Sequence, residues 1–174
     1  MTAKKIAKEL LDDDYEKTYK HTKRVVELCE KFIRAGLSVN AEMLLDAAWL
    51  HDVAKAIDAG KEHHKPKVVR EALKGYKVKD LDNLVGIIEN HKGGFSPKAY
   101  ELESAVLRIC DKLDKYSQAD CKCDNEKFEK AAKKFREAAE KCNASMMKIK
   151  AALDSNTWSA FEDAYGNILA NILE

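Results

Sequence analysis

Six residues of metal-binding type stand where the helical spacing of apolar residues predicts buried positions. His21, for example, precedes Val25 and Phe32 by four and eleven residues, so all three lie on one face of a helix. A buried carboxylate must be paired, hydrogen-bonded or bound to a cation, because leaving it alone costs several kcal/mol. Imidazole with carboxylate suits iron, manganese, zinc or similar divalent ions, so the pattern predicts a metal centre. The six residues are His21, His51, Asp52, His64, His91 and Asp111.

Taken singly, each of these residues has an ordinary structural explanation. A lone histidine on an apolar face is most often a hydrogen-bonded core residue, and Asp111 alone could pair with Arg108 or Lys115. The set favours the metal, because four of the five histidines and two aspartates end different apolar stripes. His63 stands next to His64, so the sequence leaves open which of these two faces the site.

The elements that must position these side chains are helices. Seven Gly and two Pro are few for 174 residues, and strand-like alternation is nearly absent, so the predicted fold class is all-α. Gly36 is a suitable end for the second helix, and Asn40 is a suitable cap for the third. We expect one domain over residues 1–174 with its core at about 15–118. The predicted helices cover residues 3–11, 15–35, 64–74, 79–90 and 100–116, and the third helix follows Asn40 and ends on His51 and Asp52.

The C-terminal part has a different pattern. From Phe128 to Leu153 apolar residues recur in alternating steps of four and three, which is typical of a heptad seam. The turn "DSNTW" then precedes a last amphipathic helix. We therefore predict a C-terminal helical hairpin over about 124–174, whose apolar seam would pack either on the core or in a homodimer.

Composition excludes several classes of partner. Lys and Arg number 31 against 30 Asp and Glu, so no bulk field attracts a nucleic-acid polymer. Five cysteines without regular spacing indicate free thiols in a reducing compartment. The start lacks the apolar run of a signal peptide, and no stretch approaches a membrane span. We expect a cytoplasmic protein that binds neither membranes nor nucleic-acid polymers.

The motifs around these residues resemble the HD-domain superfamily of metal-dependent phosphohydrolases. The match reads "YKHT" with His21, "LLDAAWLHDVAK" with His51 and Asp52, and "RICDKLD" with Asp111, and it covers residues 19–116. "HHKPKVV" and "IIENHKGG" look like the segments that supply two further histidines in the two-metal subgroup, which includes symmetrical diadenosine tetraphosphate hydrolases. After the final Asp of the pattern, those hydrolases have an acidic residue, a Pro and an Arg. This chain departs from that pattern, because from Asp111 it reads "DKLDKYSQ".

The resemblance implies an enzyme that hydrolyses a phosphate ester or anhydride of a nucleotide or similar small molecule. It implies two divalent ions, iron or manganese first, with zinc, cobalt, nickel or magnesium as alternatives. A hydroxide between the ions would be the nucleophile. The implied ligands are His21, His51 and Asp111 for one ion, His64 and His91 for the second, and Asp52 as a bridge.

Three cations are candidate substrate contacts. Lys55 lies one turn after His51 and could act in catalysis on a phosphate oxygen, although a solvated lysine at a helix end is an equal alternative. Lys92, followed by two glycines, and Arg24 could bind phosphate in the same way. Two other functions stay open: a di-iron oxygenase of the HD fold, and a non-catalytic ligand-binding module.

Overall fold

The structure is a computed structural model, and it describes residues 1–11, 15–34, 39–60, 62–91 and 100–117, with the single residues 126 and 133. In these residues every regular element is a helix, which confirms the all-α prediction. The predicted hairpin at 124–174 lies outside the described residues and stays a prediction.

The helices begin and end within about two residues of the predicted limits. Asn40 caps the third helix as expected, because its side-chain oxygen accepts a hydrogen bond of 3.1 Å from the Met43 backbone N–H. Pro66 opens the fourth helix, at a position where no backbone donor is needed. The elements are α1 Ala3–Leu10, α2 Glu16–Arg34, α3 Ala41–Leu50, the 3-10 helix η2 Val53–Ala56, α4 Pro66–Ala72, α5 Leu81–Asn90 and α6 Glu101–Ser117.

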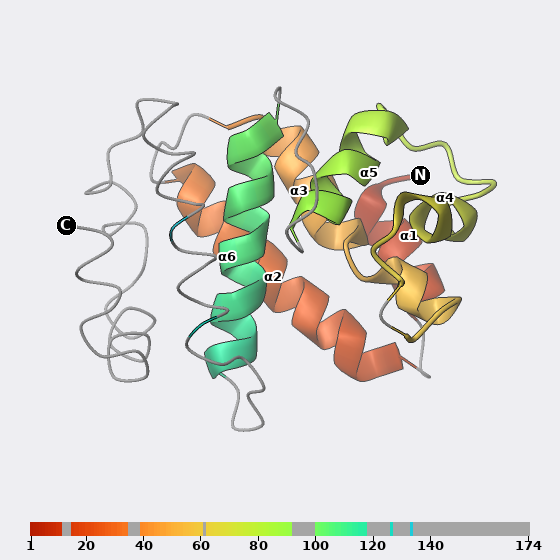
Figure 1. Cartoon of the computed structure of the whole chain (residues 1–174), viewed down its shortest axis with the longest axis horizontal. Helices are drawn as coiled ribbons and strands as arrows, with labels where there is room; N and C mark the ends of the chain where they lie inside the picture. Colours follow the sequence, from red (N-terminus) through yellow and green to blue (C-terminus); the bar gives the residue numbers. More distant parts are fainter. Residues whose placement is uncertain are drawn as a thin grey trace.

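Helix α3 lies at the centre of the arrangement. It contacts α1, α2, α5 and α6, while α2 and α6 also pack on one another and cross in Figure 1. Leu44, Ala47 and Leu50 of α3 are fully buried, as expected for a helix that is apolar on most of its faces. The end of α3 therefore delivers the next residues, His51 and Asp52, into the interior.

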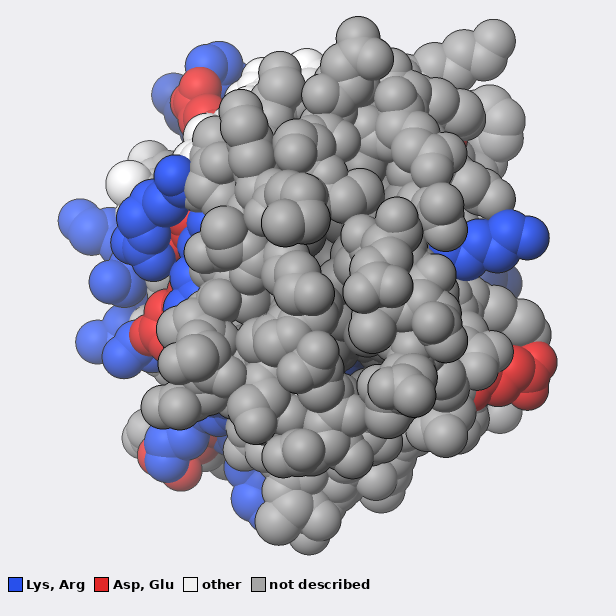
Figure 2. Space-filling view, turned by 90° about the vertical axis from the view of Figure 1, so that its left-hand side faces the viewer, with Lys and Arg blue, Asp and Glu red and all other residues white. Residues whose placement is uncertain are grey.

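Charged side chains of both signs share the surface of the described residues. Lys20 and Glu16 of α2 form an ion pair of 2.8 Å, and basic and acidic side chains lie next to one another at the edge of the view in Figure 2. Among the described helices, none has the length and apolar character that a membrane crossing requires.

Candidate metal centre

The predicted metal-binding residues come together inside the helical bundle. His51, Asp52, His91 and Asp111 are completely buried, and His21 and His64 are at most 9% exposed. They come from five segments: α2 carries one, α6 another, two follow the end of α3, one follows the end of α5, and the turn before α4 supplies the last. Apolar periodicity thus located buried polar residues correctly.

One triad consists of His21, His51 and Asp111. His21 Nε2 lies 3.1 Å from Asp111 Oδ1 and 3.4 Å from His51 Nε2, and His51 Nε2 lies 3.9 Å from Asp111 Oδ1. Neighbouring ligand atoms around one ion lie about 3 to 3.5 Å apart when the metal–ligand bonds are about 2.1 Å. The three side chains therefore need only small movements to hold one ion.

A second triad consists of Asp52, His63 and His64. Asp52 Oδ1 lies 3.3 Å from His64 Nε2 and 3.6 Å from His63 Nε2. The other oxygen, Asp52 Oδ2, lies 3.5 Å from His51 Nε2 and 3.7 Å from His21 Nε2 in the first triad. One carboxylate thus presents an oxygen to each triad, which is the arrangement of a bridging ligand.

The histidines of the second triad differ from the set that the resemblance implied. The sequence does not decide between His63 and His64, and in the structure both rings face inward, with centroids 3.6 Å apart. His91 is buried between the triads, with its ring centroid 4.7 Å from that of His64 and 5.4 Å from that of His51. His63 and His64 precede α4 in a turn, where a helical stripe cannot tell which of two neighbours points inward.

Backbone carbonyls orient three of the imidazoles. A carbonyl can only accept, so a ring nitrogen facing one carries the proton and leaves Nε2 with its lone pair for a metal. His51 and His91 each follow the last residue of a helix, where carbonyls of the final turn lack a partner in the helix. The Nδ1–H groups of His51, His63 and His91 donate to the carbonyls of Ala48, Gly60 and Ile88, respectively.

The fourth imidazole, His21, is oriented by a carboxylate that the sequence analysis missed. His21 Nδ1 lies 2.6 Å from Asp114 Oδ2. Arg24 in turn holds Asp114 with two hydrogen bonds, Nε to Oδ1 at 2.5 Å and Nη2 to Oδ2 at 3.0 Å. Arg24, predicted as a substrate contact, therefore has a carboxylate of the fold as its partner. The available signal was the spacing of Asp111 and Asp114, which puts both on one face of α6.

Comparison of the sequence with known protein families gives one match. The HD domain family matches residues 18–117, more than half of the chain. The chain belongs to the HD-domain family. Comparisons of this HD domain with curated proteins and with solved structures gave no match.

Lysines neutralise the carboxylates of this HD domain. Lys55 Nζ lies 2.5 Å from Asp52 Oδ2, on the oxygen that faces the first triad. Lys112 and Lys115 each lie 2.5 Å from one oxygen of Asp111. Asp111 thus pairs with Lys115, one of the partners considered from sequence. Lys92, the remaining predicted substrate contact, lies outside the described residues.

The protonation states of the HD centre are those that metal ligands require. Burial would raise the pKa of Asp52, but neighbouring imidazoles, His51 first, lower it well below the usual value. Burial opposes ionisation of Asp111 too, and Lys115 and His21 outweigh it, so this pKa is also lowered. Burial lowers the pKa of His51 to about 4. Two charged carboxylates and a neutral imidazole are therefore ready at neutral pH.

His21 is the exception among these groups. Burial would lower its pKa, but hydrogen bonds with Asp111 and Asp114 outweigh burial and raise it. His21 therefore keeps its second proton to higher pH than a free imidazole does, and a metal ion that binds at Nε2 competes with that proton.

Unsatisfied polar atoms show that a cation fits the second triad. Asp52 Oδ1 and His63 Nε2 are both buried, and neither forms a hydrogen bond with any residue that the structure describes. Such atoms are rare in folded proteins, because burial removes the water that would otherwise satisfy them. Oxygen and imidazole nitrogen are suitable donors for a divalent ion, so the residues of both triads fit two metal ions.

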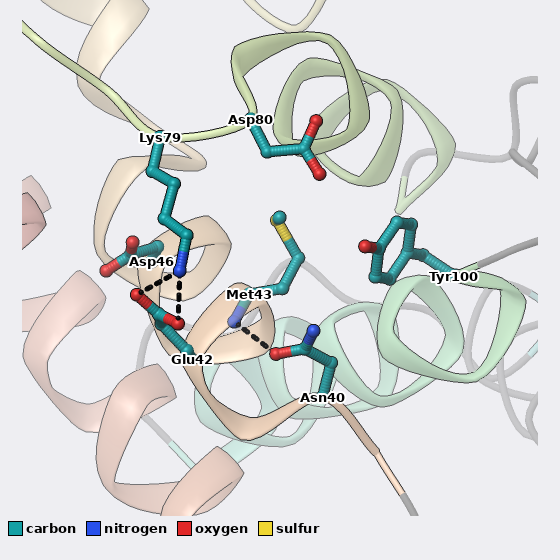
Figure 3. Close-up of a pocket in the computed structure, with 7 residues that line it drawn as sticks. All are labelled: Asn40, Glu42, Met43, Asp46, Lys79, Asp80 and Tyr100. Carbon is teal, nitrogen blue, oxygen red and sulfur yellow. Dashed lines mark hydrogen bonds and ion pairs between the residues drawn. The ribbon is translucent and has the colours of Figure 1, made fainter.

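A second polar region lies at the opposite end of α3. Glu42, Asp46 and Asp80 help to line a cavity of about 130 Å³ beside Tyr100 (Figure 3). Lys79 Nζ lies 2.9 and 3.1 Å from the two oxygens of Glu42. No pattern in the sequence indicated this cavity, and its lining residues include no histidine.

Proposed function

We propose that this HD-domain protein is a metal-dependent phosphohydrolase that cleaves an ester or anhydride bond in a nucleotide or similar small phosphorylated molecule. The observation that carries the proposal is the Asp52 carboxylate, which lies between two buried triads with one oxygen toward each. Two adjacent divalent ions are a common arrangement in enzymes that hydrolyse phosphate esters.

The chain itself would supply every ligand. His21, His51 and Asp111 would hold one ion, and His64 with His63 or His91 would hold the second, while Asp52 contacts both. Iron or manganese is our first expectation for this mixture of imidazole and carboxylate. When bound, the ions would act as Lewis acids that activate water and neutralise charge on phosphoryl oxygens.

The lysines support phosphate as the chemical class of the substrate. Lys55, Lys112 and Lys115 pair with carboxylate oxygens that divalent ions would use. Ions that take these oxygens would release the ammonium groups for an anionic substrate. Three lysines around two metal-binding carboxylates favour an anionic substrate over a neutral one.

The specific substrate follows only from the resemblance. Symmetrical diadenosine tetraphosphate hydrolases resemble the chain at the six motif residues, so dinucleoside polyphosphates are the first substrates to test. Lys55 would bind a phosphate oxygen, because it already lies beside the shared carboxylate. Arg24 would act on the substrate only if it left Asp114, so we propose that it supports the site instead.

The first experiment is metal analysis of untagged protein purified without chelator, followed by a substrate screen. We expect about two iron, manganese or similar ions per chain and metal-dependent release of phosphate or nucleoside phosphate. Asp52→Ala should lose most of the metal and the activity. Asp82→Ala, which removes a carboxylate with an 85% exposed side chain, should change neither. The proposal fails if nucleotides, dinucleoside polyphosphates and phosphomonoesters all stay intact with every divalent ion supplied.

A further inference from the structure

Two nitrogens of the Arg108 guanidinium on α6 lack an acceptor among the described residues. Its Nε and Nη1 atoms are buried, and neither forms a hydrogen bond to any part of the chain that the structure describes. Buried N–H donors of a charged group are costly to leave unsatisfied, because burial takes away their hydration. The side chain is therefore built for an anion that the described fold does not supply.

The position of Arg108 on α6 places it beside the metal centre. At 100° per residue, Arg108 lies about 60° to one side of Asp111, and Asp114 lies about 60° to the other side. The Asp114 side is filled by its contacts with His21 and Arg24 of α2. The Arg108 side also carries Lys112 and Lys115, which pair with Asp111. On one side of Asp111, the face of α6 therefore carries a residue that supports the metal ligands, and on the other side it carries three basic side chains.

Arg108 also responds to the charge of Asp111. Burial lowers the pKa of Arg108, and the nearby Asp111 carboxylate acts in the opposite direction. The two side chains are three residues apart, which is about 4.5 Å along the helix axis. Neighbouring phosphates of an anhydride can cover a span of this size.

We propose that Arg108 binds a second phosphate group of the substrate, next to the phosphate that is attacked at the metal centre. This inference rests on the proposed function and deepens it, because it selects substrates with at least two linked phosphates. A guanidinium group matches phosphate with a planar, two-pronged set of donors. Lys112 and Lys115 pair with Asp111, beside the position of the attacked phosphate. Arg108 lies about one turn from Asp111 toward the N-terminus of α6.

The test compares two inorganic probes by calorimetry on manganese-loaded protein. Imidodiphosphate offers two linked phosphates and resists hydrolysis, whereas orthophosphate offers one. Arg108→Gln should weaken imidodiphosphate binding by roughly 10- to 100-fold, the range for a lost charged hydrogen bond, and should change orthophosphate binding little. Arg34→Gln is the matched control, since its side chain is 68% exposed and pairs with Glu30. The control should bind both probes as the wild type does.

A stability measurement separates binding from a structural role. Removing an uncompensated buried charge relieves a cost, so Arg108→Met should raise the melting temperature of protein without bound anion. A lowered melting temperature together with unchanged anion affinity would assign Arg108 to the fold and overturn the inference. If Arg108→Gln does not fold, Arg108→Lys replaces it, and an unchanged affinity for imidodiphosphate would contradict the two-pronged contact.

The outcomes for the inference and for the proposed function differ. Equal imidodiphosphate affinity in wild type and Arg108→Gln would overturn only the role of Arg108. Wild-type protein that binds imidodiphosphate through Arg108 but hydrolyses no phosphate compound would leave the role of Arg108 and overturn the hydrolase. Wild-type protein that binds neither probe would overturn the role of Arg108, and the substrate screen would still decide the hydrolase.

Discussion

The two ends of α3 show how differently a helical protein can use carboxylates. At the N-terminal end, Glu42 and Asp46 line an open cavity, and Glu42 pairs with Lys79 (Figure 3). At the C-terminal end, Asp52 is completely buried and faces imidazoles on both sides. The first group keeps access to water, whereas the second has lost it. Carboxylates indicate a metal centre when they are buried together with oriented imidazoles, and acidity alone does not.

The largest expected effect comes from removing one carboxylate charge at the metal centre, compared with the same change in the cavity. Asp111→Asn should lose the ion of the first triad and reduce hydrolysis by roughly 1000-fold or more, because a Lewis acid contributes several kcal/mol to such reactions. Asp46→Asn, the same change in the cavity, should leave metal content and activity near wild type. Metal analysis and initial rates check both. Loss of metal in Asp46→Asn would contradict the view that the cavity carboxylates take no part in metal binding.

A smaller effect is expected from the support of His21. Arg24→Gln frees Asp114, which then orients the imidazole less firmly, so affinity for the first ion should fall by about 10- to 100-fold. Arg70→Gln is the matched control, because Arg70 pairs with the exposed Asp82. Competition with a metal-sensitive dye measures the affinity. Equal affinities in the two variants would reduce Arg24 to a surface ion pair.

The two ends should also differ in their dependence on pH. The pKa of His51 is about 4 in the fold against 6.5 for the free side chain, so the unfolded chain binds its proton first as pH falls. Metal-free protein should therefore lose about 3 kcal/mol through this residue between pH 6.5 and 4. Urea unfolding at several pH values checks this, and His51→Gln should show a smaller loss.

Asp46 should act with the opposite sign. Burial, with the charge of Glu42, raises the pKa of Asp46. The folded chain therefore holds this proton more strongly, and the residue favours folding as pH falls through its pKa. Asp46→Asn should make the loss of stability toward acid slightly steeper, and a shallower curve would contradict this.

The smallest effect is expected from the lysine of the cavity. Lys79 and Glu42 have side chains that are 74% and 65% exposed, so Lys79→Met should change the free energy of unfolding by less than about 1 kcal/mol. Lys55→Met should instead reduce hydrolysis, because this lysine lies on the shared carboxylate. If Lys79→Met reduced hydrolysis more than Lys55→Met does, the cavity rather than the metal centre would be the site of the reaction.

Sequence periodicity predicted most of what depends on single helices. It gave the helix limits and the burial of His21, His51 and Asp111, because one buried face repeats along each helix. The Asn40 cap followed from the residue type instead. It did not give the role of His63, which lies in a turn without a helical period. The contact of Asp114 with Arg24 joins α6 to α2, and no pattern within one helix encodes such a contact.

The lysines that pair with Asp52 and Asp111 have a consequence for the order of folding and metal binding. Asp52 and Asp111 each have a cation of the same chain, so folding of the bundle would not require a metal, unlike the folding of small domains that need the ion. Metal uptake would then be an exchange in which an incoming ion replaces an ammonium group. The metal-free protein would be a charge-balanced precursor of a metal-loaded form.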